Sequence, residues 1–132
     1  MGGRLGIDSE VVKLIVVYDS LTGNVQRFVS KLDLPSVKIT SGLSVDEPFI
    51  LVTYTIGFGE IPKTINEFLN SGYHAHYLKG VAGSGNMVWG DKYCGAAVAI
   101  SKIFNVPLIH KFELSGTQKD IEKFQQEVNK IV

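Results

Sequence analysis

A nearly continuous run of β-branched residues constrains this chain more than any other feature of its sequence. Val11–Tyr18 reads VVKLIVVY, which is typical of a strand that is buried on both faces of a sheet. A polar turn, residues 19–24, follows at once, and after it apolar residues recur at helical spacing. These apolar residues are Val25, Phe28, Val29 and Leu32. A buried strand that leads directly into an amphipathic helix predicts an α/β protein.

The same alternation continues to the end of the chain. Phe49–Tyr54, Leu78–Ala82 and Pro107–Leu114 are expected to be strands, and the alternating Val37–Thr40 an edge strand. Helical periodicity predicts three further helices, one of them from about Lys92 to Phe104. Their expected buried residues are Ile65, Phe68 and Leu69; Ala96, Ile100, Ile103 and Phe104; and Ile121, Phe124, Val128 and Ile131.

Local signals mark the ends of these helices. Pro62 is placed for the first residue of one helix, and Gly72 for its end. Thr117, with Asp120 three residues later, predicts a variant of the capping box at the start of the last helix.

Strands and helices in this order predict a parallel sheet with right-handed crossovers in a three-layer sandwich. Two arrangements compete: half of a Rossmann fold, and the five-stranded flavodoxin-like order 2-1-3-4-5. The edge character of Val37–Thr40 favours the second, because it leaves the two most apolar strands at the centre. Ligands then bind at the carboxyl ends of the strands, between the first and third. We expect one domain over residues 11–132, preceded over residues 1–10 by an extension or an expression remnant.

Composition and charge exclude several classes of function. The 132 residues carry no formal net charge, with 13 Lys and Arg against 13 Asp and Glu, and only two of the basic residues are arginines. The sequence lacks the basic stripe of a nucleic-acid-binding protein and the roughly 18-residue apolar run of a membrane span. A single cysteine allows no internal disulfide, and no signal peptide is evident. The expected compartment is therefore the cytoplasm.

The turn after the first strand carries a candidate anion site. Ser20, Thr22 and Asn24 offer side-chain donors, Gly23 allows close backbone approach, and the first N–H groups of the helix point the same way. The turn contains no Lys or Arg, and the chain has neither a Walker motif nor a well-placed GxGxxG. Neutral donors suit a phosphate that is held rather than transferred. A hydroxyl-rich helix cap is the alternative for this pattern taken alone.

Two further loops follow strands at the same edge of the sheet. In Thr55–Gly59, two glycines flank Phe58, so the backbone is free to change conformation, and a peptide there can turn its carbonyl toward a reduced flavin N5. The loop 83–91 holds the only tryptophan, Trp89. Each feature alone is more often an ordinary turn or a packing anchor. Together, the three loops would enclose a flat apolar ring that ends in a phosphate.

Four blocks of sequence resemble the NrdI family of small FMN-binding flavodoxins. The blocks are DSLTGNVQRF, TYTIGFGEIP, GVAGSGNMVWGD and PLIHKFELSGT. The resemblance extends from about Val12 to Val132, and SGNxxWG and KFELSGT are its most specific parts.

The resemblance implies a complete FMN site without a metal. It places Ser20, Leu21, Thr22, Gly23, Asn24 and Val25 around the phosphate; Thr55, Ile56, Gly57, Phe58 and Gly59 on one side of the isoalloxazine; and Ser84, Gly85, Asn86, Trp89 and Gly90 on the other. Gly57 would be the peptide that flips near N5.

The resemblance also implies a role as a maturation factor, or activase, for class Ib ribonucleotide reductase. Reduced FMN in such proteins reacts with oxygen, and the oxidant, superoxide, reaches the dimanganese site of the small subunit NrdF, where the tyrosyl radical cofactor forms. The implied partners are NrdF, molecular oxygen, and a flavin reductase or other electron donor. The alternative is a general electron-carrying flavodoxin, although such carriers tend to be strongly acidic.

Two flavin-free interpretations are weaker. A receiver domain needs an acceptor aspartate where the chain has Thr53–Thr55, and a Cys-based phosphatase needs an arginine after Cys94; the chain has neither. Cys94 is expected to pack within a helix. Asp19 is expected to turn away from the anion site and cap a backbone N–H. The three histidines are expected to lie apart, on an exposed connection and a strand, without the carboxylate neighbours that would suggest a metal site: His74, His76 and His110.

Overall fold

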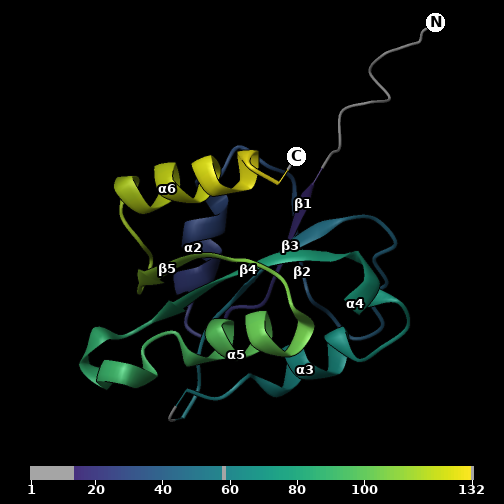
Figure 1. Cartoon of the computed structure of the whole chain (residues 1–132), viewed down its shortest axis with the longest axis horizontal. Helices are drawn as coiled ribbons and strands as arrows, with labels where there is room; N and C mark the ends of the chain where they lie inside the picture. The colour runs from purple at the N-terminus through teal and green to yellow at the C-terminus, as the bar shows by residue number, and fades with distance from the viewer. Residues whose placement is uncertain (1–13, 58, 132) are drawn as a thin grey trace, which may run out of the picture.

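The computed structural model describes residues 14–57 and 59–131, and its strands form one five-stranded parallel sheet of order β2-β1-β3-β4-β5 (Figure 1). The strands are β1 (Ile15–Tyr18), β2 (Ser36–Lys38), β3 (Phe49–Thr53), β4 (Leu78–Gly85) and β5 (Leu108–Glu113). The flavodoxin-like order expected from the sequence is therefore confirmed. The expected extension over residues 1–10 lies outside the described residues.

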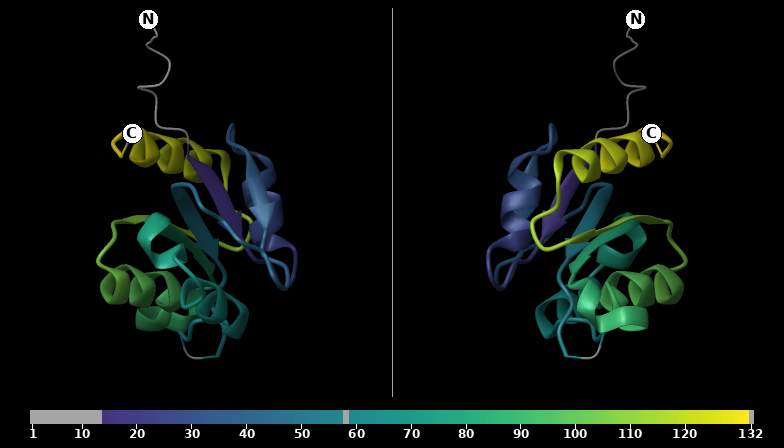
Figure 2. Two further views of the ribbon diagram at one scale, coloured as in Figure 1. Left: turned by 90° about the vertical axis from the view of Figure 1, so that its right-hand side faces the viewer. Right: turned by 90° about the vertical axis from the view of Figure 1, so that its left-hand side faces the viewer.

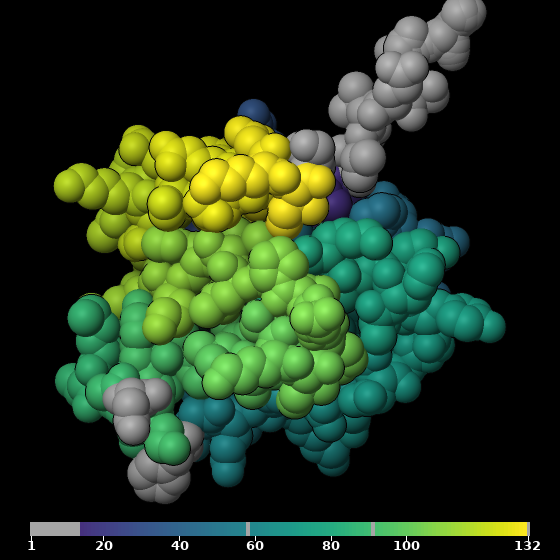
Figure 3. Space-filling view, in the orientation of Figure 1, coloured from purple at the N-terminus to yellow at the C-terminus, as the bar shows by residue number. Residues whose placement is uncertain are grey.

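Helices cover both faces of the sheet (Figure 2). They are α2 (Asn24–Ser30), α3 (Lys63–Leu69), α4 (His74–Tyr77), the 3-10 segment η2 (Met87–Lys92), α5 (Gly95–Phe104) and α6 (Gln118–Asn129). In the space-filling view, the yellow residues of α6 lie above the light green residues of α5, and the teal residues around α4 fill the right-hand side (Figure 3). None of the helices in the described part of the chain is long and apolar enough to cross a membrane.

Side chains alternate between two cores because successive strand residues point to opposite faces. Along β3, Ile50 and Val52 pack with residues of α2 and α6, whereas Phe49 and Leu51 pack with residues of α3 and α5. Every residue of β3 is buried, as expected for the central strand of a covered parallel sheet.

The last helix begins as the sequence predicts. Thr117 Oγ1 accepts a hydrogen bond from the N–H of Asp120, and the Asp120 carboxylate accepts one from the N–H of Thr117, which completes the capping box. Ile121, Phe124 and Val128 are buried on the face of α6 that meets the sheet.

Several element boundaries differ from expectation: β2 is Ser36–Lys38 and β5 is Leu108–Glu113, and α3 begins after Pro62 and ends before Gly72. Two larger differences lie next to the candidate site. β4 continues through Gly85 instead of ending at Ala82, and α5 begins at Gly95 instead of Lys92. Cys94 precedes this helix with a left-handed φ of 55°, so the helix cannot include it. The expected burial of Ile103 is wrong, because its side chain is 65% exposed.

His74 is buried, contrary to its expected position on an exposed connection. The N–H of Val45 donates to His74 Nε2 at 3.0 Å, and His74 Nδ1 lies 2.7 Å from the carbonyl oxygen of Phe68. The neutral tautomer with its proton on Nδ1 satisfies both partners. The imidazole also stacks on the Phe68 ring, with 3.8 Å between centroids. His74 therefore joins the loop before β3 to the end of α3.

Replacing this histidine tests its role in stability. His74→Ala leaves the Val45 N–H and the Phe68 carbonyl without a partner and opens a cavity, so we expect a loss of about 2–4 kcal/mol in the free energy of unfolding. Urea denaturation followed by circular dichroism measures the loss. His76→Ala, in the exposed position two residues later, is the control and is expected to cost less than about 0.5 kcal/mol. Equal effects of the two substitutions would contradict the assignment.

Candidate functional site

The turn between β1 and α2 presents polar groups at the carboxyl edge of the sheet. Ser20 Oγ accepts hydrogen bonds from the N–H groups of Gly23 at 3.1 Å and Gln26 at 3.3 Å. Both bonds use the oxygen as acceptor, so among the described groups the hydroxyl hydrogen of Ser20 remains to donate to a ligand. Gly23 has a φ of 89°, a left-handed conformation that glycine adopts without strain.

Asp19 turns away from these donors, as the sequence predicts. Its Oδ1 accepts a hydrogen bond from the N–H of Ser20 at 2.8 Å, and its Oδ2 accepts one from the hydroxyl of Thr64 on α3. The carboxylate is nearly buried, at 9% exposure. The negative charge is therefore held by two donors on the α3 side of the turn.

A cavity of about 200 Å³ lies where the three predicted loops meet. Its lining comes from the start of α2, the loop after β3, the end of β4 and the segment that follows it, together with one residue from the turn after β5. The lining residues are Asn24, Thr55, Gly57, Gly59, Ser84, Gly85, Asn86, Trp89, Lys92, Cys94 and Leu114. The structure therefore brings together residues from all three loops that the sequence assigned to one edge.

Backbone packing shapes this cavity. A Cβ on Gly95 would lie 2.7 Å from the Cα of Gly59, and a Cβ on Gly85 would lie 2.8 Å from the nitrogen of Cys94. Real Cβ atoms do not approach so closely, so any side chain at these glycines would push the loops apart. The loop after β3 is closed by a tight pair of backbone hydrogen bonds between Ile56 and Glu60.

The turn after β5 forms a further wall that the sequence analysis did not assign. Leu114 has a left-handed φ of 54°, which is uncommon for a residue other than glycine. Its N–H donates to the carbonyl of Gly85 at 3.0 Å, and its carbonyl accepts a hydrogen bond from Ser84 Oγ at 2.6 Å. Leu114 and Asn24 also line a second, adjoining hollow of about 580 Å³. The only signal for this wall in the sequence is the block KFELSGT, which contains Leu114.

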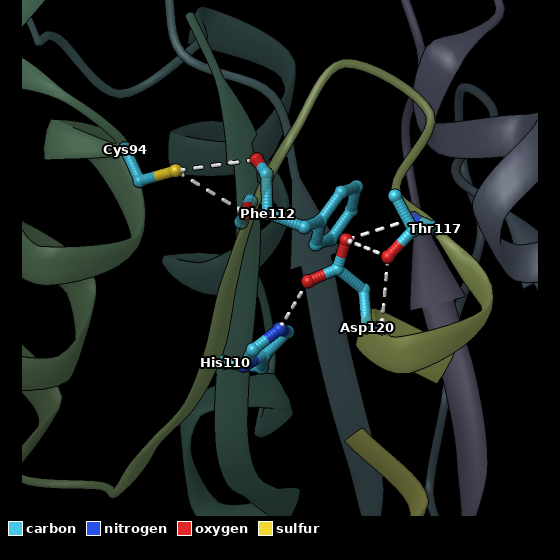
Figure 4. A network of polar contacts seen from close by, with 6 residues as sticks. Cys94, His110, Phe112, Thr117 and Asp120 are labelled. Atoms are coloured by element: carbon cyan, nitrogen blue, oxygen red, sulfur yellow. Dashed lines mark hydrogen bonds and ion pairs between the residues drawn. The ribbon is translucent and has the colours of Figure 1, made fainter. Parts of the chain in front are cut away.

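A polar network holds the turn after β5 in place (Figure 4). His110 Nε2 lies 2.7 Å from Asp120 Oδ1, and Asp120 also belongs to the capping box with Thr117. His110 therefore has one carboxylate neighbour, Asp120, which the sequence analysis did not pair with it. Burial alone would raise the pKa of Asp120, but hydrogen bonds from His110 and Thr117 outweigh it and hold this pKa below its ordinary value.

Cys94 lies at the floor of the cavity and has a structural environment. Its Sγ is directed at the carbonyl oxygens of Gly83, at 3.3 Å, and Phe112, at 3.7 Å (Figure 4). Burial raises the pKa of the thiol to about 11, so it remains protonated at neutral pH. The expectation that Cys94 packs inside a helix is wrong, because it lies just before α5.

The other predicted site residues lie in several different environments. The turn after β1 contains Ser20, Leu21, Thr22 and Gly23, whereas the side chain of Val25 is buried in the core. Ile56 lies in the tight loop after β3, and Gly90 lies at a kink within η2. Phe58 lies outside the described residues. Lys92, Cys94 and Leu114 line the cavity without having been predicted.

The architecture is that of a flavodoxin-like α/β protein. The structure is similar to a short-chain flavodoxin associated with a non-canonical PDU bacterial microcompartment, with a TM-score of 0.72 and 20% identity over 92% of this chain and 97% of that one. It is also similar to the Flv1 flavodiiron core from Synechocystis, with a TM-score of 0.58 and 18% identity over 93% of this chain and 37% of that one. At these identities the likeness concerns the fold.

The sequence identifies the family. A family model described as NrdI flavodoxin-like matches residues 16–126. The protein NrdI of Bacillus licheniformis is 54% identical over 118 residues, which cover 89% of this chain and 88% of the relative. The SPbeta prophage-derived protein NrdI of Bacillus subtilis is 46% identical, over 88% of this chain and 92% of the relative. The protein NrdI of Macrococcus caseolyticus is 44% identical, over 89% of this chain and 91% of the relative. The chain belongs to the NrdI family of flavodoxin-like proteins. Membership of this family supports a flavin as the cofactor.

The Asp120 network yields a test of how the turn after β5 is anchored. Asp120→Asn keeps the size of the side chain but removes its charge, and we expect a loss of about 1–2 kcal/mol of stability at pH 7. Because the pKa of Asp120 is lowered by folding, this stabilisation is present above the unfolded pKa of about 3.9 and is lost as the pH falls through the folded value.

Urea denaturation of the wild type and Asp120→Asn between pH 7 and pH 2.5 measures this dependence. The difference in stability is expected to shrink in the most acidic samples. Glu122→Gln, on the exposed part of the same helix, is the control and is expected to show little difference at any pH. A difference in stability between the two proteins that stays constant into the acid range would show that the charge of the Asp120 carboxylate does not contribute to the stability.

Proposed function

We propose that this protein binds FMN at the carboxyl edge of its sheet and serves in the maturation of a class Ib ribonucleotide reductase. The observation that carries the proposal is the cavity lined jointly by Asn24, by the Thr55–Gly59 loop and by the segment from Ser84 to Trp89. In a member of the NrdI family, a flavin is the ligand that we expect at such a cavity. Its glycine-rich lining admits a flat ring, and its polar groups are uncharged except for Lys92.

The turn after β1 would hold the phosphate of FMN. The hydroxyl of Ser20 and the amide of Asn24 can donate to phosphate oxygens, and Gly23 has no Cβ to keep its backbone away from them. Thr22 Oγ1 accepts from Asn24 Nδ2 at 3.2 Å, so its own hydroxyl hydrogen can also donate. Leu21, also in this turn, would contribute to the phosphate site through its backbone.

The glycine-rich loops would hold the isoalloxazine. Gly57 has a φ of 53° and Gly59 a φ of 97°. Because glycine has no Cβ, the backbone at these two residues can change its orientation without a steric clash. We assign Gly57 as the residue whose carbonyl would meet the N5 edge of the reduced ring. Asn86, whose Oδ1 already caps the N–H of Val88 at 3.1 Å, and Trp89 would bound the other side.

FMN bound here would supply redox chemistry, the one-electron reduction of O₂ to superoxide, which would serve as oxidant for the dimanganese site of NrdF. The protein positions the ring and limits its access to water. Met87 and Val88 are 62% and 83% exposed beside the cavity, and such apolar surface suits a partner protein that covers the site. An unidentified reductase would supply the electrons. The zero net charge of the chain gives little electrostatic steering toward many partners.

The visible absorption spectrum during anaerobic reduction tests this proposal. The purified protein, loaded with FMN, is reduced and then mixed with air in the presence of manganese-loaded NrdF. We expect the flavin bands to bleach and return, and a tyrosyl radical to form on NrdF. Reversible flavin reduction without a radical would favour a general electron carrier. Failure to bind added FMN would overturn the proposal.

Gly23→Asp tests the assigned phosphate turn. A Cβ at Gly23 would lie 2.9 Å from Arg27 Nη1, the φ of 89° strains any side chain, and a carboxylate would repel the phosphate. We therefore expect this variant to lose stoichiometric FMN binding, measured by flavin fluorescence titration. Gly42→Asp is the matched control, since Gly42 has a φ of 82° and open space around its Cβ position. Full FMN occupancy in Gly23→Asp would remove this turn from the site.

A further inference from the structure

Arg27 makes a closed triangle of hydrogen bonds beside the turn after β1. Its Nε donates to Ser115 Oγ at 3.0 Å, and its Nη2 donates to Asn24 Oδ1 at 2.7 Å. The hydroxyl of Ser115 then donates to the same Asn24 Oδ1 at 2.8 Å. The triangle joins α2 to the turn after β5, which are 88 residues apart in the sequence.

This triangle fixes the orientation of the Asn24 amide. An arginine can only donate, so the amide atom that faces Arg27 must be the oxygen. With two donors on Oδ1, the Nδ2 group points the other way, where it donates one hydrogen to Thr22 Oγ1 at 3.2 Å. Its second hydrogen remains for a ligand. Asn24 therefore presents a donor, rather than a carbonyl oxygen, to the turn.

Arg27 also brings a positive charge to a turn that contains none. Its Nη1 lies so close to Gly23 that a Cβ there would be 2.9 Å away. None of the ion pairs among the described residues involves Arg27, while the nearby Asp19 carboxylate is held by Ser20 and Thr64. Two of the five N–H groups of the guanidinium are used in the triangle, which leaves three for other acceptors.

We infer that Arg27 is a specificity-determining residue that makes this site prefer a phosphate monoester of a flavin to the flavin alone. It acts in two ways: with Ser115 it orients Asn24 as a donor, and its charge offsets that of a dianionic phosphate at the turn. The inference rests on the proposed FMN site and adds the residue that selects the phosphorylated form. No residue within the turn itself supplies such a charge.

Comparison of FMN with riboflavin tests the inference, because the two ligands share the ring and differ in the phosphate. Kd values for both are measured by flavin fluorescence quenching on the wild type, Arg27→Gln and Arg27→Lys. We expect Arg27→Gln to weaken FMN binding about tenfold and to leave riboflavin binding unchanged, which is the loss of one charge-assisted contact. Arg27→Lys keeps the charge but not the forked geometry, and should recover part of the lost preference.

Salt gives a second readout that a purely structural role would not change. The wild-type affinity for FMN should fall more steeply with ionic strength than that of Arg27→Gln, since exposed charges are screened. Lys31→Gln removes an equal charge from the residue that ends the same helix and is expected to change neither Kd. Thermal unfolding of the flavin-free proteins verifies that each variant is folded.

The outcomes separate this inference from the function on which it rests. A parallel loss of FMN and riboflavin affinity in Arg27→Gln would make Arg27 a structural brace and overturn the inference. Unchanged affinities would overturn it too. In both cases the wild type still binds FMN and the proposed function stands. A wild type that binds neither ligand would overturn the proposed function and this inference with it.

Discussion

The parallel pairing of five strands is the constraint on which the rest of this molecule depends. In a parallel sheet all strands end at the same edge, so the turns after β1, β3, β4 and β5 meet there, although they come from distant parts of the sequence. The pairing is held by burial: β3 is fully enclosed, and its alternate residues belong to two separate cores. A sheet covered on both faces leaves its loop edge as the place where polar groups can gather.

Backbone approach, more than side-chain size, then decides the shape of the site. Gly59 packs against Gly95 at the start of α5, and Gly85 packs against Cys94. Leu114 completes the wall by taking a left-handed conformation, which hydrogen bonds to Gly85 and from Ser84 compensate. Strain held in this way by its surroundings is common at functional sites. The His110–Asp120 contact and the capping box fix the far end of the same turn.

The sequence was sufficient for the sheet order, for most of the buried faces and for the three loops, because hydrophobic periodicity and turn chemistry are local signals. It failed where tertiary contacts overrode local preference. Gly83–Gly85 has little intrinsic tendency to form a strand, yet it pairs with β5. Cys94 lies outside the expected helix with a left-handed backbone, and its thiol packs against the carbonyls of Gly83 and Phe112. The burial of His74 and the wall at Leu114 depend on partners that no short window of sequence contains.

The charges near the turn after β1 show why composition alone could not describe this site. The chain is neutral overall, and both Asp19 and Arg27 lie within a few residues of Gly23. Their effects on a ligand differ because their partners differ. The Asp19 carboxylate accepts hydrogen bonds from Ser20 and Thr64 and is nearly buried. Arg27 donates to Ser115, lies against Gly23 and has further N–H groups that can donate to a ligand. A turn flanked by one charge of each sign can therefore favour anions, because the orientation of each side chain, and not the sum of the charges, determines what a ligand meets.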